Sequence, residues 1–228
     1  MKRVELWPRL LACRQIDQVD AQLSAALALD PKRHTAVGLV TCDQDDSMYV
    51  ALDHATKFAN VDVMFGQSFY AGSKHASGPY SGEILGILGG RDPDEIAEGL
   101  LAVREALKVV RFQTFEGPAD SQPAFLAHVI AETGRYLAPQ AGIAPGAPMA
   151  YLIAPPLEAV VAVDAALKAA PVKLGKWIPP PSETNFAGAF LTGELHHLEA
   201  SRDAFVEAVE AVAHSPLAAA RRPDRERR

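Results

Sequence analysis

Cysteine is scarce in this chain of 228 residues, with Cys13 and Cys42 the only two. Two thiols cannot build the disulfide framework of a small secreted protein, so we expect a reducing, cytoplasmic setting. No apolar run approaches the roughly 18 residues that a membrane-spanning helix needs. The first residues are partly basic but include no apolar segment followed by small residues, so we expect no signal peptide. The sequence therefore predicts no membrane partner.

Positive charge is also scarce outside the C-terminal tail. The formal net charge is −6, and residues 221–228 alone carry +3, so the rest of the chain carries −9. An acidic body repels phosphates, which argues against a nucleic-acid partner. We interpret residues 217–228 as a flexible basic tail. The remaining composition, 49% apolar, is that of a globular protein, and the length suits one large domain or two small ones.

The second half of the chain repeats the first. Asp53–Val61 aligns with Asp164–Val172 at an offset of 111 residues, with five identities. Further matches keep the same order: Leu11-Ala12 with Leu126-Ala127, Ala36–Val40 with Met149–Ile153, and Tyr80–Leu85 with Phe186–Leu191. A turn-rich linker, residues 116–123, separates the halves. We therefore expect two domains of common origin, 1–116 and 117–228.

Each half is expected to run helix, strand, helix, strand, loop, strand, helix. The first helix of each half begins at Leu11 or Leu126 in this interpretation, and the strands of the first half are expected near 35–41, 61–68, 81–88 and 111–114. Asp92, followed by proline and acids, is a favourable helix start. The apolar residues after it, spaced at i, i+4, i+7 and i+11, lie on one helical face. Helices packed on one face of a mostly antiparallel sheet give an α+β fold.

An acidic cluster, Cys42-Asp43-Gln44-Asp45-Asp46-Ser47, falls where a strand is expected to end and a helix to begin. Carboxylates there stabilise the helix through its dipole, which is the simple structural interpretation. The alternative is a site for a small cation or amine, because three carboxylates within four residues leave negative charge for a cationic ligand to offset. A calcium loop of the EF-hand type does not fit, since its glycine and closing glutamate are missing.

Three other features carry less. Gly86–Gly90 invites a phosphate-loop interpretation, but the glycine spacing is wrong and acids follow it, so a tight turn is expected. His196 and His197 are expected on a strand, pointing to opposite faces, which makes a shared metal ion unfavourable. Cys13 falls in a helical apolar pattern and is expected to be a buried, inert thiol. No nucleophile, metal set or cofactor loop remains, so we expect neither an enzyme nor a cofactor.

Two loops occupy equivalent places in the repeat. Residues 71–79 are small and flexible, whereas residues 178–185 are stiffened by three consecutive prolines. Matching loops suggest that both line one common feature of the assembled protein. Two ordinary hairpin loops are the alternative.

At this point the chain resembles a known family, the tandem-domain shell proteins of bacterial microcompartments, and within it the L-type of ethanolamine utilisation. The resemblance covers residues from about Leu10 to Pro216. Its most specific stretches are Asp45-Asp46, Phe69–Gly72, Phe125–Val129, Pro148–Ala159, Asp164–Lys168, Pro179–Asn185 and Ala189–Gly193. The resemblance implies two circularly permuted, ferredoxin-like shell domains in each chain. It also implies a homotrimer, shaped as a pseudohexameric tile that packs with other shell proteins in a cytoplasmic microcompartment.

The same resemblance implies roles for particular residues. Lys57 and Lys168 would donate hydrogen bonds at the tile edge. The two matched loops would form a central pore that opens and closes, with the gating residues Gly72, Ser73, Lys74, His75, Pro179, Pro180, Pro181, Ser182, Glu183 and Thr184. A smaller acidic opening in each subunit would bind an amino alcohol through Asp45, the carbonyl of Phe112 and Glu158, with Asp46 nearby. A small-molecule sensor that binds an amine at these carboxylates is the alternative function.

Overall fold

The computed structural model describes residues 1–69, 82–117, 122–180, 182 and 185–218. Its elements follow the order β1 (Arg3–Leu6), β2 (Leu10–Ile16), α1 (Ala21–Ala26), β3 (Ala36–Cys42), α2 (Asp45–Phe58), β4 (Asp62–Ser68), β5 (Ile84–Gly90), α4 (Pro93–Ala106), β6 (Phe112–Phe115), β7 (Leu126–Ile130), α5 (Ala138–Ala141), β8 (Met149–Ala154), α6 (Pro156–Ala169), β9 (Lys173–Ile178), β10 (Ala187–Thr192) and α7 (Leu195–His214). None of the helices in these ranges is long and apolar enough to cross a membrane.

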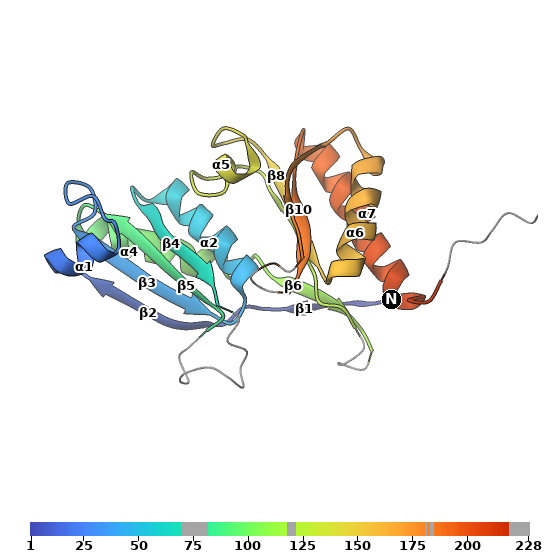
Figure 1. Ribbon diagram of the computed structural model, residues 1–228, viewed down its shortest axis with the longest axis horizontal. Helices are drawn as coiled ribbons and strands as arrows, with labels where there is room; N and C mark the ends of the chain where they lie inside the picture. The colour runs from blue at the N-terminus through green and yellow to red at the C-terminus, as the bar shows by residue number, and fades with distance from the viewer. Residues whose placement is uncertain (70–81, 118–121, 181, 183–184, 219–228) are drawn as a thin grey trace, which may run out of the picture.

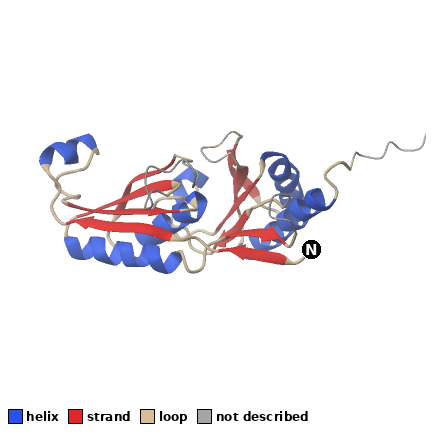
Figure 2. Ribbon diagram, turned by 90° about the horizontal axis from the view of Figure 1, so that it is seen from below, coloured by secondary structure: helices blue, strands red, loops and turns tan. Residues whose placement is uncertain are grey.

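Two antiparallel four-stranded sheets share one topology. The first sheet has the order β2-β3-β5-β4, and the second has the equivalent order β7-β8-β10-β9. Helices α2 and α4 cover one face of the first sheet, and α6 and α7 cover one face of the second. Figure 2 shows helices lying along a single face of the strands. The expected α+β layers and the internal repeat are therefore present.

The two sheets follow each other along the long axis of the molecule (Figure 1). Helix α2 lies between the first sheet and the second, whereas α6 and α7 lie at the end of the molecule. Because of this, the larger core joins both halves: Leu52 of α2 belongs to the same cluster as Tyr151 and Ile153 of β8. A ribbon of β1 paired with β6 runs beneath the second half.

Several local predictions are wrong. The segments from Leu11 and from Leu126 form strands β2 and β7, not helices, because each is an edge strand whose residues alternate between a helix-covered face and the opposite face. Cys13 therefore lies on a strand, and partial burial raises the pKa of its thiol. The glycine run 86–90 is not a turn but part of β5. A Cβ at Gly86 would come within 2.9 Å of Leu52 and Val40, so the glycine lets helix and strand approach closely.

The aligned repeat is also one residue out of register in β3. It pairs Val40 with Ile153, yet Val40 packs under the helices of its own half, and Ile153 lies on the sheet face opposite its own helices. Strand pairing gives the correct match, because Ile16 pairs with Val37 just as Ile130 pairs with Met149. A shift of one residue along a strand exchanges its two faces, and the short sequence match could not detect this.

The expected start of α4 is correct. The Asp92 carboxylate accepts hydrogen bonds from the backbone N–H groups of Asp94 and Glu95, and Pro93 is the first helical residue. The apolar face that the spacing predicted is buried against the first sheet, with Ile96 and Val103 fully covered. Helix α2 begins directly after β3, as the acidic cluster predicted, so the repeat and the caps together place the candidate site.

Candidate functional site

The acidic cluster surrounds the junction between β3 and α2. Cys42 ends the strand, and its thiol donates a hydrogen bond to the Gln44 carbonyl at 2.9 Å. Burial raises the pKa of this thiol to about 12, so it stays protonated and inert. Asp45 and Asp46 are the first two helical residues, and both are buried. The helix dipole stabilises their charge at that position.

Although Asp45 and Asp46 are adjacent, they line two different cavities. Asp45 lines a cleft of about 190 Å3 together with Asp43, Glu83 and Phe112. The Asp45 carboxylate accepts a hydrogen bond from the Ser68 hydroxyl at 2.8 Å and one from the Asp46 backbone N–H at 2.7 Å. The structure therefore brings together two of the expected residues of the acidic opening, Asp45 and Phe112.

Negative charge in this cleft is only partly balanced. Arg9 offsets Asp43, donating from its backbone N–H at 2.7 Å and from Nε at 2.8 Å. Burial, and then the charges of Asp45 and Asp43, raise the pKa of the Glu83 carboxyl above its ordinary value. Sequence reasoning missed Glu83. Its position just before β5, a charged residue preceding an apolar strand, was the available signal.

Glu158 lies elsewhere. It is in the first turn of α6 and does not line this cleft within the described part of the chain. Sequence reasoning grouped it with Asp45 only through the resemblance, and no contact described here joins the two carboxylates. The acidic partner that lines the cleft beside Asp45 is Glu83 instead.

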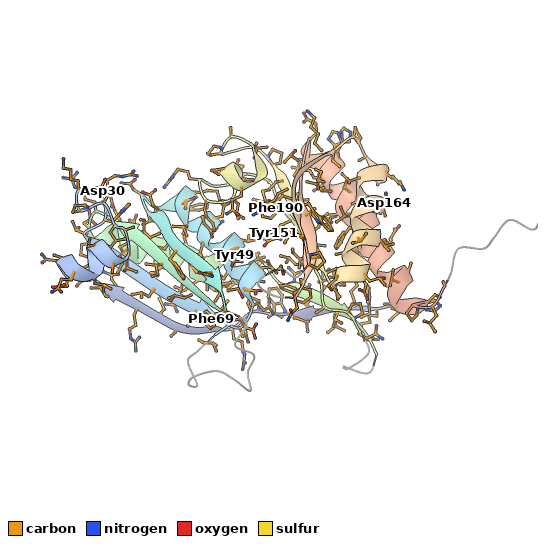
Figure 3. All side chains as sticks on the ribbon, in the orientation of Figure 1. Asp30, Tyr49, Phe69, Tyr151, Asp164 and Phe190 are labelled. Carbon is orange, nitrogen blue, oxygen red and sulfur yellow. The ribbon has the colours of Figure 1, made fainter. Side chains whose placement is uncertain are left out.

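Asp46 faces the second cavity, which lies between α2 and the second sheet. The Tyr151 hydroxyl of β8 donates a hydrogen bond to Asp46 Oδ1. Burial, and then the charge of Asp46, raise the pKa of the Tyr151 phenol well above its ordinary value, so it remains a donor. The cavity has a volume of about 370 Å3 and is lined on the α2 side by Asp46 and Tyr49. Figure 3 shows Tyr49, Tyr151 and Phe190 near one another between the two sheets.

The predicted gating residues are only partly within the described structure. Gly72, Ser73, Lys74, His75, Pro181, Glu183 and Thr184 lie outside the described residues. Pro179 and Pro180 follow β9, and Pro179 and Ser182 line the second cavity. The first loop connects β4 to β5 and the second connects β9 to β10, so the two loops do join equivalent strands.

The two predicted edge lysines differ. Lys57 Nζ donates to the Glu132 carbonyl of the second half at 2.7 Å, so it joins the two halves within one chain. Lys168 Nζ forms an exposed ion pair with Asp164 at 2.5 Å. The tile-edge role of both side chains stays a prediction.

His196 and His197 lie in the first turn of α7, so the expectation that they lie on a strand is wrong. Their rings lie 3.9 Å apart. Within the described ranges, no group of three or more His, Cys, Asp or Glu side chains is arranged to hold a metal ion.

Known proteins decide the family. No family model matches the chain. The bacterial microcompartment shell protein EutL of Escherichia coli is 46% identical over 211 residues, which is 92% of this chain and 95% of that protein. EutL of Clostridium perfringens is 44% identical over 218 residues, covering 95% and 99% of the two chains. The chain belongs to the EutL family of bacterial microcompartment shell proteins.

Solved structures agree with this assignment. EutL structures from Clostridium perfringens and Leptotrichia buccalis superpose with TM-scores of 0.89 and 0.90, each at 45% identity and over at least 95% of both chains. The trimeric shell protein PduB shares the fold at 19% identity, with a TM-score of 0.73. The expectations of a tandem-domain shell fold and of a structural shell protein, not an enzyme, are confirmed.

Proposed function

We propose that this EutL-family chain forms a homotrimer whose six related domains, 1–116 and 117–228 of each copy, make one pseudohexameric tile. The observation that carries the proposal is the outer face of α6. Leu157, Val160 and Val161 on this face are 61%, 54% and 45% exposed. Three neighbouring apolar side chains exposed to this extent favour a protein–protein contact.

The repeat identifies what would cover this face. Helices α2 and α6 have equal lengths and an offset of 111, so Val160 corresponds to Tyr49. Tyr49 faces the second sheet, where Tyr151 lines the same cavity. The first-sheet counterpart of Tyr151 is Leu39, because Leu39 pairs with Arg14 as Tyr151 pairs with His128. The α6 face of one copy would therefore pack on the first sheet of the next, and a head-to-tail contact of this kind can close into a ring.

The acidic cleft is the small opening in this account. Asp45, Glu83 and Phe112 line a cavity of about 190 Å3, a size suited to a small molecule with an ammonium group. An ammonium has three donors, and two carboxylates with a carbonyl supply acceptors for them. An amino alcohol fits these requirements. Glu158 and Asp46 stay weaker candidates for this opening, because neither lines the cleft.

The remaining parts of the proposal concern the assembled shell. The equivalent loops 71–80 and 178–185 would meet at the threefold axis as a central pore that opens and closes. Glycines in the first loop permit conformational change, while the prolines of the second move as a stiffer unit. Lys57 and Lys168 would contact neighbouring tiles and other shell proteins, in a shell located in the cytoplasm.

Sedimentation tests the trimer. We expect about 73 kDa, three times the chain mass of 24.4 kDa, at micromolar concentration. Val160→Glu should give monomers, because a charge cannot be buried at an apolar contact without a partner. Leu101→Glu, on an exposed face of α4, is the matched control and should remain trimeric. A monomeric wild-type chain would overturn the proposal.

Calorimetry with ethanolamine tests the small opening. Asp45→Asn and Glu83→Gln should each weaken binding about tenfold, since each removes one charge-assisted acceptor. Glu158→Gln is the control and should leave binding unchanged. Unaltered binding in Asp45→Asn would contradict the assignment of the cleft. Ethanolamine binding without sheets in electron micrographs would instead favour the amine sensor.

A further inference from the structure

The cavity between the two halves has no part in the proposed shell functions. Its volume of about 370 Å3 lies within the range of small-molecule sites. Helix α2 and β4 supply one side, and β8, β9 and β10 supply the other, with α5 at the end. This cavity is distinct from the acidic cleft, because the residues that line the two cavities are different throughout.

Aromatic rings dominate the cavity wall. Tyr49, Tyr136, Tyr151 and Phe190 all line it. The rings of Tyr151 and Phe190 pack edge to face, with centroids 4.6 Å apart and an interplanar angle of 88°. Such rings form flat, apolar surfaces, and a further planar ring gains both buried area and favourable ring contacts between them. The wall therefore favours a ligand with an aromatic ring over a small aliphatic one.

A single carboxylate, Asp46, stands in this wall and is only 4% exposed. The Tyr151 hydroxyl donates to its Oδ1, which holds the side chain in one orientation. A buried carboxylate with a neutral donor gains from a cationic ligand, because the cation offsets the charge that burial disfavours.

The one lysine in the lining has other partners. Lys176 Nζ donates to Gln140 Oε1 at 3.1 Å and lies 5.4 Å from the centroid of the Phe190 ring. Among the described ion pairs, none joins Lys176 to Asp46. The lysine therefore leaves the carboxylate end of the cavity to the ligand.

We propose that this cavity binds a small aromatic amine, with its ammonium group at the Asp46 carboxylate and its ring among Tyr49, Tyr136 and Phe190. The site is separate from the acidic opening, and the ligand class differs by its ring from the amino alcohols proposed there. The inference does not depend on the opening or on the trimer.

Three probes separate the ring from the charge. Titration calorimetry should show phenethylamine binding at least about tenfold more tightly than ethylamine, which has no ring, since burial of a ring favours binding strongly. It should also bind at least about tenfold more tightly than 2-phenylethanol, which has no ammonium group. Equal affinity for the three probes, or no binding of phenethylamine, would overturn the proposal.

Two adjacent aspartates give a matched pair of variants. Asp46→Asn should weaken phenethylamine binding about tenfold or more, whereas Asp45→Asn should leave it unchanged. The opposite pattern is expected for ethanolamine at the acidic cleft, so the two proposals fail independently. Loss of phenethylamine binding in Asp45→Asn alone would place the amine in the acidic cleft and contradict the inference.

A second variant covers the case in which Asp46→Asn unfolds. Gln140 is exposed on α5 at the edge of the cavity, so Gln140→Trp should leave the fold intact and fill the entrance. We expect thermal unfolding like that of the wild type and phenethylamine affinity lowered at least about tenfold. Full-strength binding in this variant would exclude the cavity as the site.

Discussion

Helices α2 and α6 begin and end at equivalent residues, yet their outer faces have opposite surroundings. The outer face of α2 lies against the second sheet, and its Asp53 is fully buried. The Asp53 carboxylate accepts hydrogen bonds from the backbone N–H groups of Gly134, Leu137 and Tyr136 at 2.6, 2.8 and 3.2 Å. The equivalent Asp164 of α6 remains 62% exposed.

This difference shows how one duplicated surface is used twice. The residues that face the second sheet from α2 include Asp46 and Tyr49, and their counterparts on α6 are Leu157 and Val160. The inner contact is therefore polar and encloses a cavity, whereas the outer face is apolar. Helix α1, which has no buried residue, lies where the segment around Gly134 lies in the second half. We infer that a second copy covers α6 as the second sheet covers α2.

The largest expected effect concerns the two aspartates. Asp53→Ala should lower the free energy of unfolding by about 3–5 kcal/mol, because three buried N–H groups lose their acceptor. Asp164→Ala should change it by less than about 0.5 kcal/mol, since its ion pair is exposed. Urea unfolding in the monomeric Val160→Glu background measures both. Equal losses in the two variants would remove the contrast between the helices.

The second prediction uses His128 of β7, which pairs with Tyr151 and corresponds to the exposed Arg14 of β2. Burial, with Arg111, Lys57 and Arg202 nearby, lowers the pKa of His128 to about 4. A lowered pKa means that the neutral form stabilises the fold. This contribution is complete above the unfolded-state pKa of about 6.5 and is lost as the pH falls toward 4.

The free energy of unfolding should therefore fall by about 3 kcal/mol across that pH window because of His128. His128→Gln should remove this part of the pH dependence, and Arg14→Gln should leave it in place. Urea unfolding at several pH values measures the effect. A pH profile that stays the same in His128→Gln would contradict the burial of this side chain between the two halves.

The sequence predicted much of this comparison, and the parts that it missed have physical reasons. The Asp-x-x-x-Lys match placed α2 and α6 correctly, because helix positions are retained where one side chain meets a partner. The strands β2 and β7 were taken for helices. A short edge strand with mixed burial, such as Leu10–Ile16, has no clear alternation that a pattern could reveal.

The site was predicted only in part for a similar reason. Asp45 and Phe112 could be carried over from the family, and the structure places both in one cleft. Glu83 comes from a strand of the first half, and its approach to Asp45 depends on the pairing of β3 with β5. That Asp46 points away from its neighbour depends on the packing of α2 against β8. Neither fact is local in the sequence, so no motif reports it.

The smallest expected effect concerns the two lysines. Lys57→Met should lower the free energy of unfolding by about 1 kcal/mol, because it removes the hydrogen bond to the Glu132 carbonyl that joins the halves. Lys168→Met should have less than about half of that effect, since its pair with Asp164 is exposed on both sides. Thermal unfolding of the two variants, again in the monomeric background, makes the comparison. A larger loss for Lys168→Met would reverse it.

Disulfide crosslinking between copies tests the central claim most directly. Tyr49 and Tyr151 line one cavity within the chain, and their counterparts are Val160 and Leu39. The double variant Val160→Cys with Leu39→Cys should therefore form covalent dimers and trimers on mild oxidation, while each single variant and the wild type, with its own Cys13 and Cys42, should not. Absence of any covalent product from the double variant, in a protein that still sediments as a trimer, would show that α6 does not meet the first sheet of a second copy.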